Sequence, residues 1–142
     1  MIRHIWSVLC HTASIDRKTN STSLLNILET MVLNKEPTKD NPATLVQASL
    51  VSLWIREELS IDSVGKMRAY IIAPDGNKLA PYIELDIFLK ENIVSHRTRI
   101  DIKGTPLPLL GQYNFHIDYK KTLDQEWQTA AIIPLMLRHV KF

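Results

Sequence analysis

His116 and Asp118 are the residues of this chain whose types and spacing best suit chemistry. They lie two positions apart in the segment GQYNFHIDY, residues 111–119. Side chains two apart on a β-strand share one face and are about 6.6–6.8 Å apart along the chain. An imidazole and a carboxylate so placed can bind one metal ion, or the carboxylate can orient the imidazole. The alternative is that both are solvated residues on the outer face of an ordinary strand.

The His116–Asp118 pair is not a complete metal site, because a zinc enzyme uses at least three protein ligands. His11, Asp16 and His96 are candidates for a third ligand by residue type alone, and no spacing selects one of them. The segment around the pair alternates polar with apolar residues, as a half-buried strand does. We therefore favour the solvated strand face and expect no bound cofactor. A metal-dependent or small-ligand enzyme built on this pair is the alternative.

Nucleophilic catalysis has little support in the sequence. Cys10 is the single cysteine and His11 follows it, but adjacent residues of a strand face opposite ways, so His11 cannot serve the Cys10 thiol. Cys10 is predicted to be a core residue. The chain has four glycines and no Gly-x-Ser-x-Gly motif, which disfavours serine hydrolases and phosphate-binding loops. We expect a protein that is not an enzyme.

Basic residues gather in the second half of the chain. Arg97 and Arg99 would share one strand face, and Lys120 and Lys121 follow later. A sheet face that combines arginine with aromatic residues can bind single-stranded nucleic acid, but the same pattern is typical of an outward strand face or a protected sheet edge. The net charge of +2 and the pI of about 8.7 are low for a dedicated nucleic-acid binder. Nucleic-acid binding is the third hypothesis.

The elements that carry these residues are strands, because an alternation of period two dominates the chain. It is clear in residues 67–72, 95–103 and 111–119, and clearest in residues 82–89. There the predicted inward residues are Ile83, Leu85, Ile87 and Leu89, and the predicted outward residues are Tyr82, Glu84, Asp86 and Phe88.

Further strands are predicted at both ends of the chain. Residues 4–13 and 23–33 have strand-like sequence on either side of a polar turn. The last predicted strand is residues 126–137, in which Pro134 indicates a sheet edge or a bulge.

Turn residues separate the predicted strands. The segment APDGNK, residues 73–78, combines proline, aspartate and glycine in the order that a tight turn uses. Residues 103–111 contain two prolines and predict a corner, not a hairpin. Residues 34–44 predict an exposed loop.

Residues 44–57, TLVQASLVSLWIRE, fit either a strand buried on both faces or a helix. Leu50, Trp54 and Glu57 match the i, i+3, i+4 spacing of a helix. The β-branched and aromatic content and the missing N-cap favour a strand. Residues 59–65 predict a short helical turn or a loop.

The whole chain, residues 1–142, is predicted to be one domain. Its apolar fraction of 45% and charged fraction of 23% are those of a globular protein. About eight strands without βαβ alternation predict a mainly antiparallel β-sandwich with at most one short helix. Greek-key connections of the immunoglobulin-like or C2-like kind are expected.

Aromatic residues indicate where such a sandwich could bind a partner. Tyr70, Tyr82 and Phe88 lie on the predicted outward, polar faces of their strands, and an exposed face that carries two or three aromatics is typical of a partner surface. The alternative is that these rings complete the core. The three tryptophans, Trp6, Trp54 and Trp127, fit either interpretation.

The compartment is predicted to be the cytoplasm. A single cysteine cannot form an internal disulfide. The N-terminal apolar run is shorter than the apolar core of a signal peptide. No segment approaches the roughly 18 apolar residues of a membrane span, so no membrane association is expected.

Four segments together resemble a family of small uncharacterised bacterial β-sandwich proteins. They are VLCHTASID, LLNILE, IIAPDGN and GQYNFHID. The resemblance spans most of the chain. It implies a β-sandwich and a bacterial cytoplasmic location, and it implies no activity and no site residue.

The function expected from the sequence is therefore that of a non-enzymatic binding or interaction module. Its partner is expected to be a second copy of the chain, through a sheet face or edge, or another protein. The metal-dependent enzyme and the weak nucleic-acid binder are the second and third hypotheses.

Overall fold

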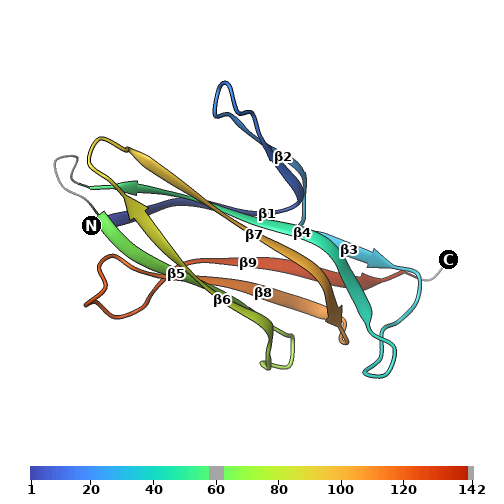
Figure 1. Ribbon diagram of the computed structural model, residues 1–142. Helices are drawn as coiled ribbons and strands as arrows, with labels where there is room; N and C mark the ends of the chain where they lie inside the picture. Colours follow the sequence, from blue (N-terminus) through green and yellow to red (C-terminus); the bar gives the residue numbers. More distant parts are fainter. Residues whose placement is uncertain (58–62, 141–142) are drawn as a thin grey trace.

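Nine strands form two packed sheets in the computed structural model, which describes residues 1–57 and 63–140 (Figure 1). The part of the chain so described contains no helix, and so none that could span a membrane. The strands are β1 (Ile2–Ile15), β2 (Thr22–Ile27), β3 (Thr30–Leu33), β4 (Ala43–Arg56), β5 (Ser63–Ile72), β6 (Lys78–Leu89), β7 (Ser95–Leu107), β8 (Gly111–Lys120) and β9 (Gln128–His139).

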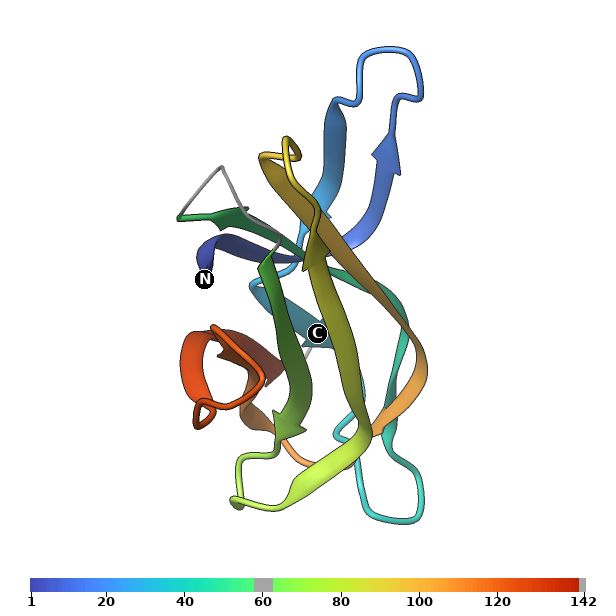
Figure 2. The same ribbon diagram turned by 60° about the vertical axis from the view of Figure 1, so that its left-hand side comes forward.

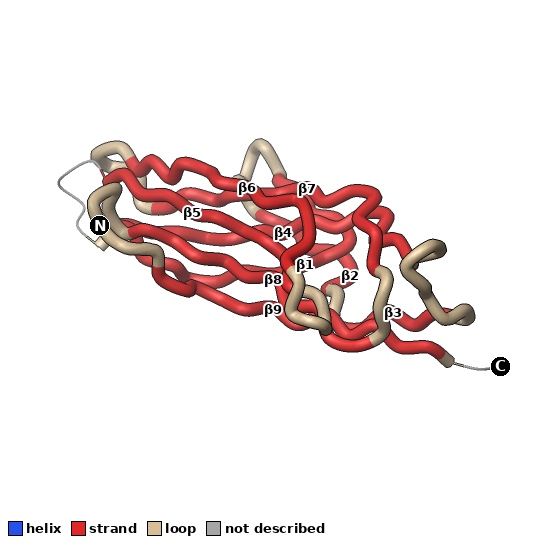
Figure 3. The backbone as a smooth tube through the Cα atoms, turned by 90° about the horizontal axis from the view of Figure 1, so that it is seen from below, coloured by secondary structure: helices blue, strands red, loops and turns tan. Residues whose placement is uncertain are grey.

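One sheet has four strands in the order β2-β1-β4-β7, and the other has five in the order β3-β9-β8-β5-β6. All neighbouring strands are antiparallel except β3 and β9, which are parallel. The chain crosses from one sheet to the other after β2, β3, β4, β6 and β7 (Figure 3), so neither sheet is formed by one continuous segment. The prediction of a mainly antiparallel β-sandwich is confirmed.

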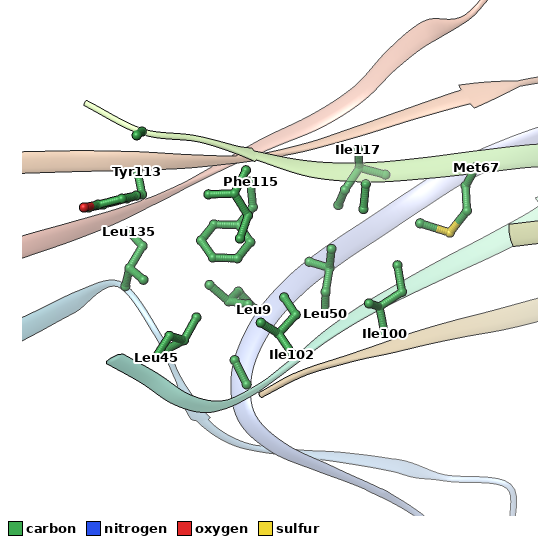
Figure 4. Packing of buried hydrophobic residues seen from close by; sticks show 14 of the residues in the cluster. Leu9, Leu45, Leu50, Met67, Ile100, Ile102, Tyr113, Phe115, Ile117 and Leu135 are labelled. Atoms are coloured by element: carbon green, nitrogen blue, oxygen red, sulfur yellow. The ribbon is translucent and has the colours of Figure 1, made fainter. Parts of the chain in front are cut away.

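The hydrophobic core fills the space between the sheets, and both layers supply it through alternate residues (Figure 4). In β5, and in β8 as far as Ile117, the buried positions follow the predicted alternation. In β6 the predicted outward residues are all exposed. Members of this core include Leu9, Leu50, Trp54, Met67, Ile71, Ile87, Ile100, Tyr113, Phe115, Ile117 and Leu135. Period-two patterning therefore identifies the inner faces correctly.

The segment predicted as one strand at residues 23–33 is two strands in different sheets, which is why nine strands replace the expected eight or so. Asn26 adopts a left-handed backbone conformation with φ of 56°, which asparagine tolerates better than most residues. Pairing with β1 ends at Ile27, directly after Asn26, and Thr30 begins the parallel pairing with β9. The apolar pattern continues across this break, so the pattern could not reveal it.

Residues 44–57, which fitted strand or helix, form the central strand β4 and its end. Ala48 to Ser52 are buried without interruption, because β4 is covered on both faces. Its inner face joins the main core. Its outer face lies under a second small cluster that contains Cys10, Ala13 and Val51. Cys10 is free and buried, so its prediction as a core residue is confirmed.

The second cluster exists because β1 bends away from β4. Up to Cys10, β1 pairs with β4, and from Cys10 onward it pairs with β2. Residues 11–27 therefore form a hairpin, here called the arm, which projects from the sandwich in Figures 1 and 2. Two arginines of β7 hold the arm in place. Arg99 Nη1 donates to Ala13 O at 2.9 Å, and Arg97 Nη2 donates to Asn20 O at 3.1 Å.

The predicted turns occur where expected. In APDGNK, Gly76 has φ of 87° and its N–H donates to Ala73 O at 2.9 Å. Of the predicted corner at residues 103–111, residues 108–110 form the crossing from β7 to β8 between different sheets, but residues 103–107 continue β7 and pair with β4. Residues 34–42 form the exposed loop before β4. Of the segment predicted as a helical turn or loop, residues 59–62 lie outside the described residues and 63–65 begin β5.

Pro134 lies on an open stretch of strand edge, in agreement with the prediction for it. Met136 N donates to Glu29 O on the β3 side of β9, and N–H groups two residues apart in a strand point the same way. The Pro134 nitrogen, which carries no hydrogen, therefore points to that side. Pairing of β3 with β9 begins at Met136, so no acceptor from β3 is left without a donor at Pro134.

Candidate interaction face

His116 and Asp118 lie on β8, but they do not form the solvated pair that the alternation predicted. His116 is half-buried, and Asp118 is only 4% exposed. Both residues keep the outward phase of β8, because His116 pairs with Tyr70 and Asp118 pairs with Arg68 in an unbroken register with β5. The pairing with β9 does shift after Ile117, but the extra residue of that bulge is on β9. The shared outward face of the two residues is therefore as predicted, but the prediction that Asp118 is solvated is wrong, because side chains of a neighbouring strand cover it and the alternation within one strand cannot show this.

Asp118 is held by two side chains of the neighbouring strand β5. Arg68 Nε donates to Asp118 Oδ2 at 2.8 Å, and the Tyr70 hydroxyl donates to the same oxygen at 3.2 Å. Burial and the nearby Asp118 carboxylate raise the pKa of Tyr70, so its hydroxyl stays protonated and able to donate. Asp118 thus links β8 to β5 through side-chain hydrogen bonds on the side of the sheet that faces away from the core.

A row of stacked rings crosses three strands beside this ion pair. Tyr70 of β5 and His116 of β8 stack with centroids 5.1 Å apart and ring planes 11° apart. Tyr82 of β6 stacks on the other side of Tyr70, with centroids 6.3 Å apart and planes 22° apart. Stacking of each ring on its neighbour removes the rotamer freedom that an isolated surface tyrosine would have.

Cations lie against these rings. The Arg68 guanidinium is 4.4 Å from the centroid of Trp127 and 5.8 Å from that of Tyr70. The Lys120 ammonium also lies against Trp127, 5.0 Å from its ring centroid. Lys78 lies 4.3 Å from the Tyr70 centroid. Such cation–π contacts contribute roughly 0.5–1 kcal/mol each at exposed sites, so they order long side chains that would otherwise move freely.

We call this surface the aromatic face. It lies on the outer side of the five-stranded sheet, since its strand positions alternate with core residues such as Ala69 and Phe115. Its residues are Arg68, Tyr70, Lys78, Tyr82, His116, Asp118, Lys120 and Trp127. Tyr82 is 47% exposed, so the row of rings reaches solvent. The aromatic residues were predicted either to share an exposed face or to complete the core. Tyr70 and Tyr82 share this outer face.

The tryptophans occupy three different places. Trp54 is in the main core, Trp6 packs on the small cluster under the arm, and Trp127 lies on the aromatic face. Phe88 is 41% exposed and pairs with Val64 at another part of the same sheet.

The candidate third metal ligands lie away from His116 and Asp118. His11 and Asp16 belong to the arm, and His96 belongs to β7, so all three are in or next to the four-stranded sheet. Within residues 1–57 and 63–140, no group of three or more His, Cys, Asp and Glu side chains is arranged to hold a metal ion. His116 and Asp118 therefore remain two candidate metal ligands without a third, and the Asp118 carboxylate already accepts hydrogen bonds from Arg68 and Tyr70.

The four basic residues of the nucleic-acid hypothesis lie on two different sheets. Arg97 and Arg99 are on β7, and both bind carbonyl oxygens of the arm. Arg99 also pairs with Asp101 at 2.9 Å. Lys120 ends β8 in the other sheet and Lys121 follows it; the Lys121 ammonium lies 3.9 Å from the Glu57 carboxylate. They do not form one basic surface.

A polar network lies close to Trp54 of the core. Ser7 Oγ is 2.7 Å from His4 Nε2 and 2.6 Å from Ser52 Oγ. A serine bonded to an imidazole is the first half of a nucleophile–base pair. Here the same hydroxyl is shared with the fully buried Ser52, and the imidazole packs edge-on against Trp54 at 5.1 Å. We assign the network to satisfying polar groups inside the sandwich.

The histidines of this region predict an acid-sensitive fold. Burial lowers the pKa of His4 and of His96 below the usual 6.5. As the pH falls below about 6.5, the unfolded chain binds protons that the folded chain resists, so stability decreases. Above that pH the two imidazoles are neutral in the folded and in the unfolded chain, so they no longer change the stability. Chemical denaturation at pH 5 and pH 7.5 measures the difference in the free energy of unfolding between the two pH values. We expect this difference to be smaller for His4→Gln and His96→Gln than for the wild type; equal differences would contradict the assignment.

No protein-family model matches this chain, and a search of curated proteins finds no match either. The resemblance to a bacterial β-sandwich family therefore stays a prediction.

Sequence reasoning did not identify Arg68 and Lys78 as members of this face, and it left Trp127 open between the core and a partner surface. Arg68 could have been found, because it alternates with Met67 and Ala69 and so points outward beside Tyr70. Trp127 lies in the connection before β9, and no periodicity places a loop residue over a particular strand.

Proposed function

We propose that the protein is a non-enzymatic interaction module that binds another protein through the aromatic face. The observation that carries this proposal is the ordered row of Tyr82, Tyr70 and His116, with Arg68 held between the Tyr70 and Trp127 rings. The core does not require this arrangement, because the rings and cations lie on the outer side of the five-stranded sheet.

The residue types of the face support a protein partner. Tyrosine, tryptophan and arginine are the residues most enriched among those that dominate binding energy at protein interfaces. The rings and the guanidinium are already fixed by stacking and by Asp118, so little side-chain entropy remains to be lost on binding. Glu84 and Asp86 flank the face on β6 and are exposed, so the surface carries both signs of charge. Mixed charges suit a protein partner, whereas the carboxylates would repel the phosphate groups of a nucleic acid.

The two other hypotheses have weaker support. A metal enzyme built on His116 and Asp118 requires a third ligand, and the described residues offer none nearby. A nucleic-acid site would need Arg97 and Arg99 to join Lys120 and Lys121, but these pairs are on separate sheets.

Cross-linking inside the native cell tests the proposal. A photoreactive benzoylphenylalanine at position 82 should form a discrete adduct with one other protein, because Tyr82 is an exposed member of the face. Adding Trp127→Ala should weaken this adduct about tenfold or more, since truncating a central aromatic residue of an interface typically costs at least that much affinity.

The matched control places the same photoreactive residue at Val46, which is 73% exposed on β4 of the other sheet. It should give no such adduct. The proposal fails if position 82 yields no discrete adduct, if position 46 yields the same one, or if Trp127→Ala leaves its amount unchanged while the variant remains folded by circular dichroism.

A further inference from the structure

Four strands lie at the ends of the two sheets, and three of them carry features that discourage pairing with another strand. A bare edge exposes unpaired backbone groups, and charged residues, proline or short length protect against this. β7 carries Arg97, Arg99 and Lys103 together with Pro106, and β6 carries Lys78, Glu84 and Asp86. β3 has only four residues.

The fourth end strand, β2, lacks all of these features. Its sequence TSLLNI contains neither a charge nor a proline over six residues. Leu25 is 54% exposed and Ile27 is 58% exposed. An exposed, uncharged and partly apolar strand edge is a template for another strand. β2 is also the outer strand of the arm, which projects from the body of the molecule in two views (Figures 1 and 2).

The hydrogen bonds of the arm show which backbone groups face the open edge. Asp16 N donates to Ser21 O, so Ser21 points toward β1. Alternate residues of a strand point to opposite sides, which directs the backbone groups of Thr22 and Leu24 away from β1. The bond from Arg99 to Ala13 O agrees with this phase, because Ala13, the partner of Leu24, directs its carbonyl away from β2.

We propose that a second copy of this chain pairs antiparallel with β2, so that the two four-stranded sheets join through their arms. The two-fold axis passes beside Leu24, where each Leu24 donates to the carbonyl of the other. In this register Ser23 lies opposite the partner's Leu25. The two Leu25 side chains are then diagonal neighbours across the new pair, within reach of each other.

The chemistry of the edge favours a second copy as the occupant. A two-fold contact brings each residue near its own equivalent, so any charged residue would meet a like charge. β2 has no charge to oppose such a meeting, whereas the charged residues on β6 and β7 would oppose it. The arm projects from the sandwich (Figures 1 and 2), which leaves the outer edge of β2 accessible to the arm of a second copy.

Sedimentation velocity over a range of protein concentrations is the first test. The wild type should associate reversibly to a dimer. Leu25→Lys should raise the dissociation constant about tenfold or more, because it removes an apolar contact and places two ammonium groups near each other. Val46→Lys, at a more exposed position of the same sheet, should behave as the wild type. A wild type that is monomeric at every concentration overturns the proposal.

Disulfide trapping tests the register. Opposed residues in a non-hydrogen-bonded antiparallel pair have Cα atoms about 4.5 Å apart, which lies within disulfide range. A mixture of the Ser23→Cys and Leu25→Cys proteins should therefore form a covalent heterodimer under mild oxidation. Each variant alone should cross-link at least about tenfold more slowly, since diagonal positions are roughly 7–8 Å apart. Equal cross-linking in all three samples, or none in the mixture, contradicts the pairing.

Discussion

Replacing Trp54 with alanine is expected to lower the free energy of unfolding by about 3–5 kcal/mol, the range for deleting a buried aromatic side chain. Trp54 is fully buried on the inner face of β4. Its ring lies 5.1 Å from that of His4 on β1 and 5.5 Å from that of Tyr119 on β8. One side chain therefore connects both sheets, and its removal leaves a cavity that neighbours on two layers cannot fill. Equilibrium denaturation in urea measures the loss.

Two matched variants separate the contributions to this loss. Trp54→Phe keeps most of the ring contacts but loses the bond from Nε1 to Thr98 Oγ1, which is 3.1 Å long, so a smaller loss than for alanine is expected. Trp6→Ala removes a half-buried tryptophan beside the small cluster under the arm and should also cost less than Trp54→Ala. A loss below about 1 kcal/mol for Trp54→Ala, the mean for an ordinary substitution, would contradict the role given to this residue.

The fold was predictable wherever local periodicity and tertiary environment agree. The inner residues of 82–89 were identified correctly, because β6 is paired on one side and exposed on one face, so its sequence alternates strictly. The break near Asn26 was not predictable, because Leu25, Ile27 and Leu28 continue the apolar pattern on both sides of it. The burial of β4 on both faces was recognised from its composition, but its cover, the arm, comes from a distant segment.

The candidate face was predictable only in its separate parts. His116, Asp118, Tyr70 and Tyr82 were each identified from one strand. Their assembly depends on the register that places Tyr70 opposite His116 and Arg68 opposite Asp118, and residues 46 or more apart in sequence carry no local sign of such register. That register also brings the Arg68 and Tyr70 side chains onto the Asp118 carboxylate, and this contact buries it.

The two proposed surfaces belong to different sheets. The aromatic face lies on the five-stranded sheet, and the β2 edge belongs to the four-stranded sheet. Occupation of one therefore leaves the other open. A dimer joined by its arms would present two aromatic faces, and two weak contacts held in one assembly bind a repeated or dimeric partner more tightly than either contact alone.

The ion pair beneath the aromatic face leads to the second large effect, in which removal of Arg68 costs more than removal of Asp118. The side chain of Asp118 is 5% exposed and that of Arg68 is 27% exposed. Arg68→Met leaves a buried carboxylate without its cation, for which a loss of about 3 kcal/mol is expected. Asp118→Ala leaves a guanidinium that can turn toward water, so we expect about half that loss. Urea denaturation of both variants at pH 7 measures the difference.

The double variant Arg68→Met with Asp118→Leu decides whether charge burial is the cause. Replacing both members of a buried pair by apolar residues is often close to neutral, so the double variant should be more stable than Arg68→Met alone. The Lys66–Asp86 pair on the same two strands is the control, since its atoms are 3.8 Å apart and Asp86 is 76% exposed; Asp86→Asn should leave stability unchanged, as exposed pairs usually do. If Arg68→Met and the double variant are equally unstable, the loss comes from packing of the Arg68 side chain against Trp127 and not from the unpaired carboxylate.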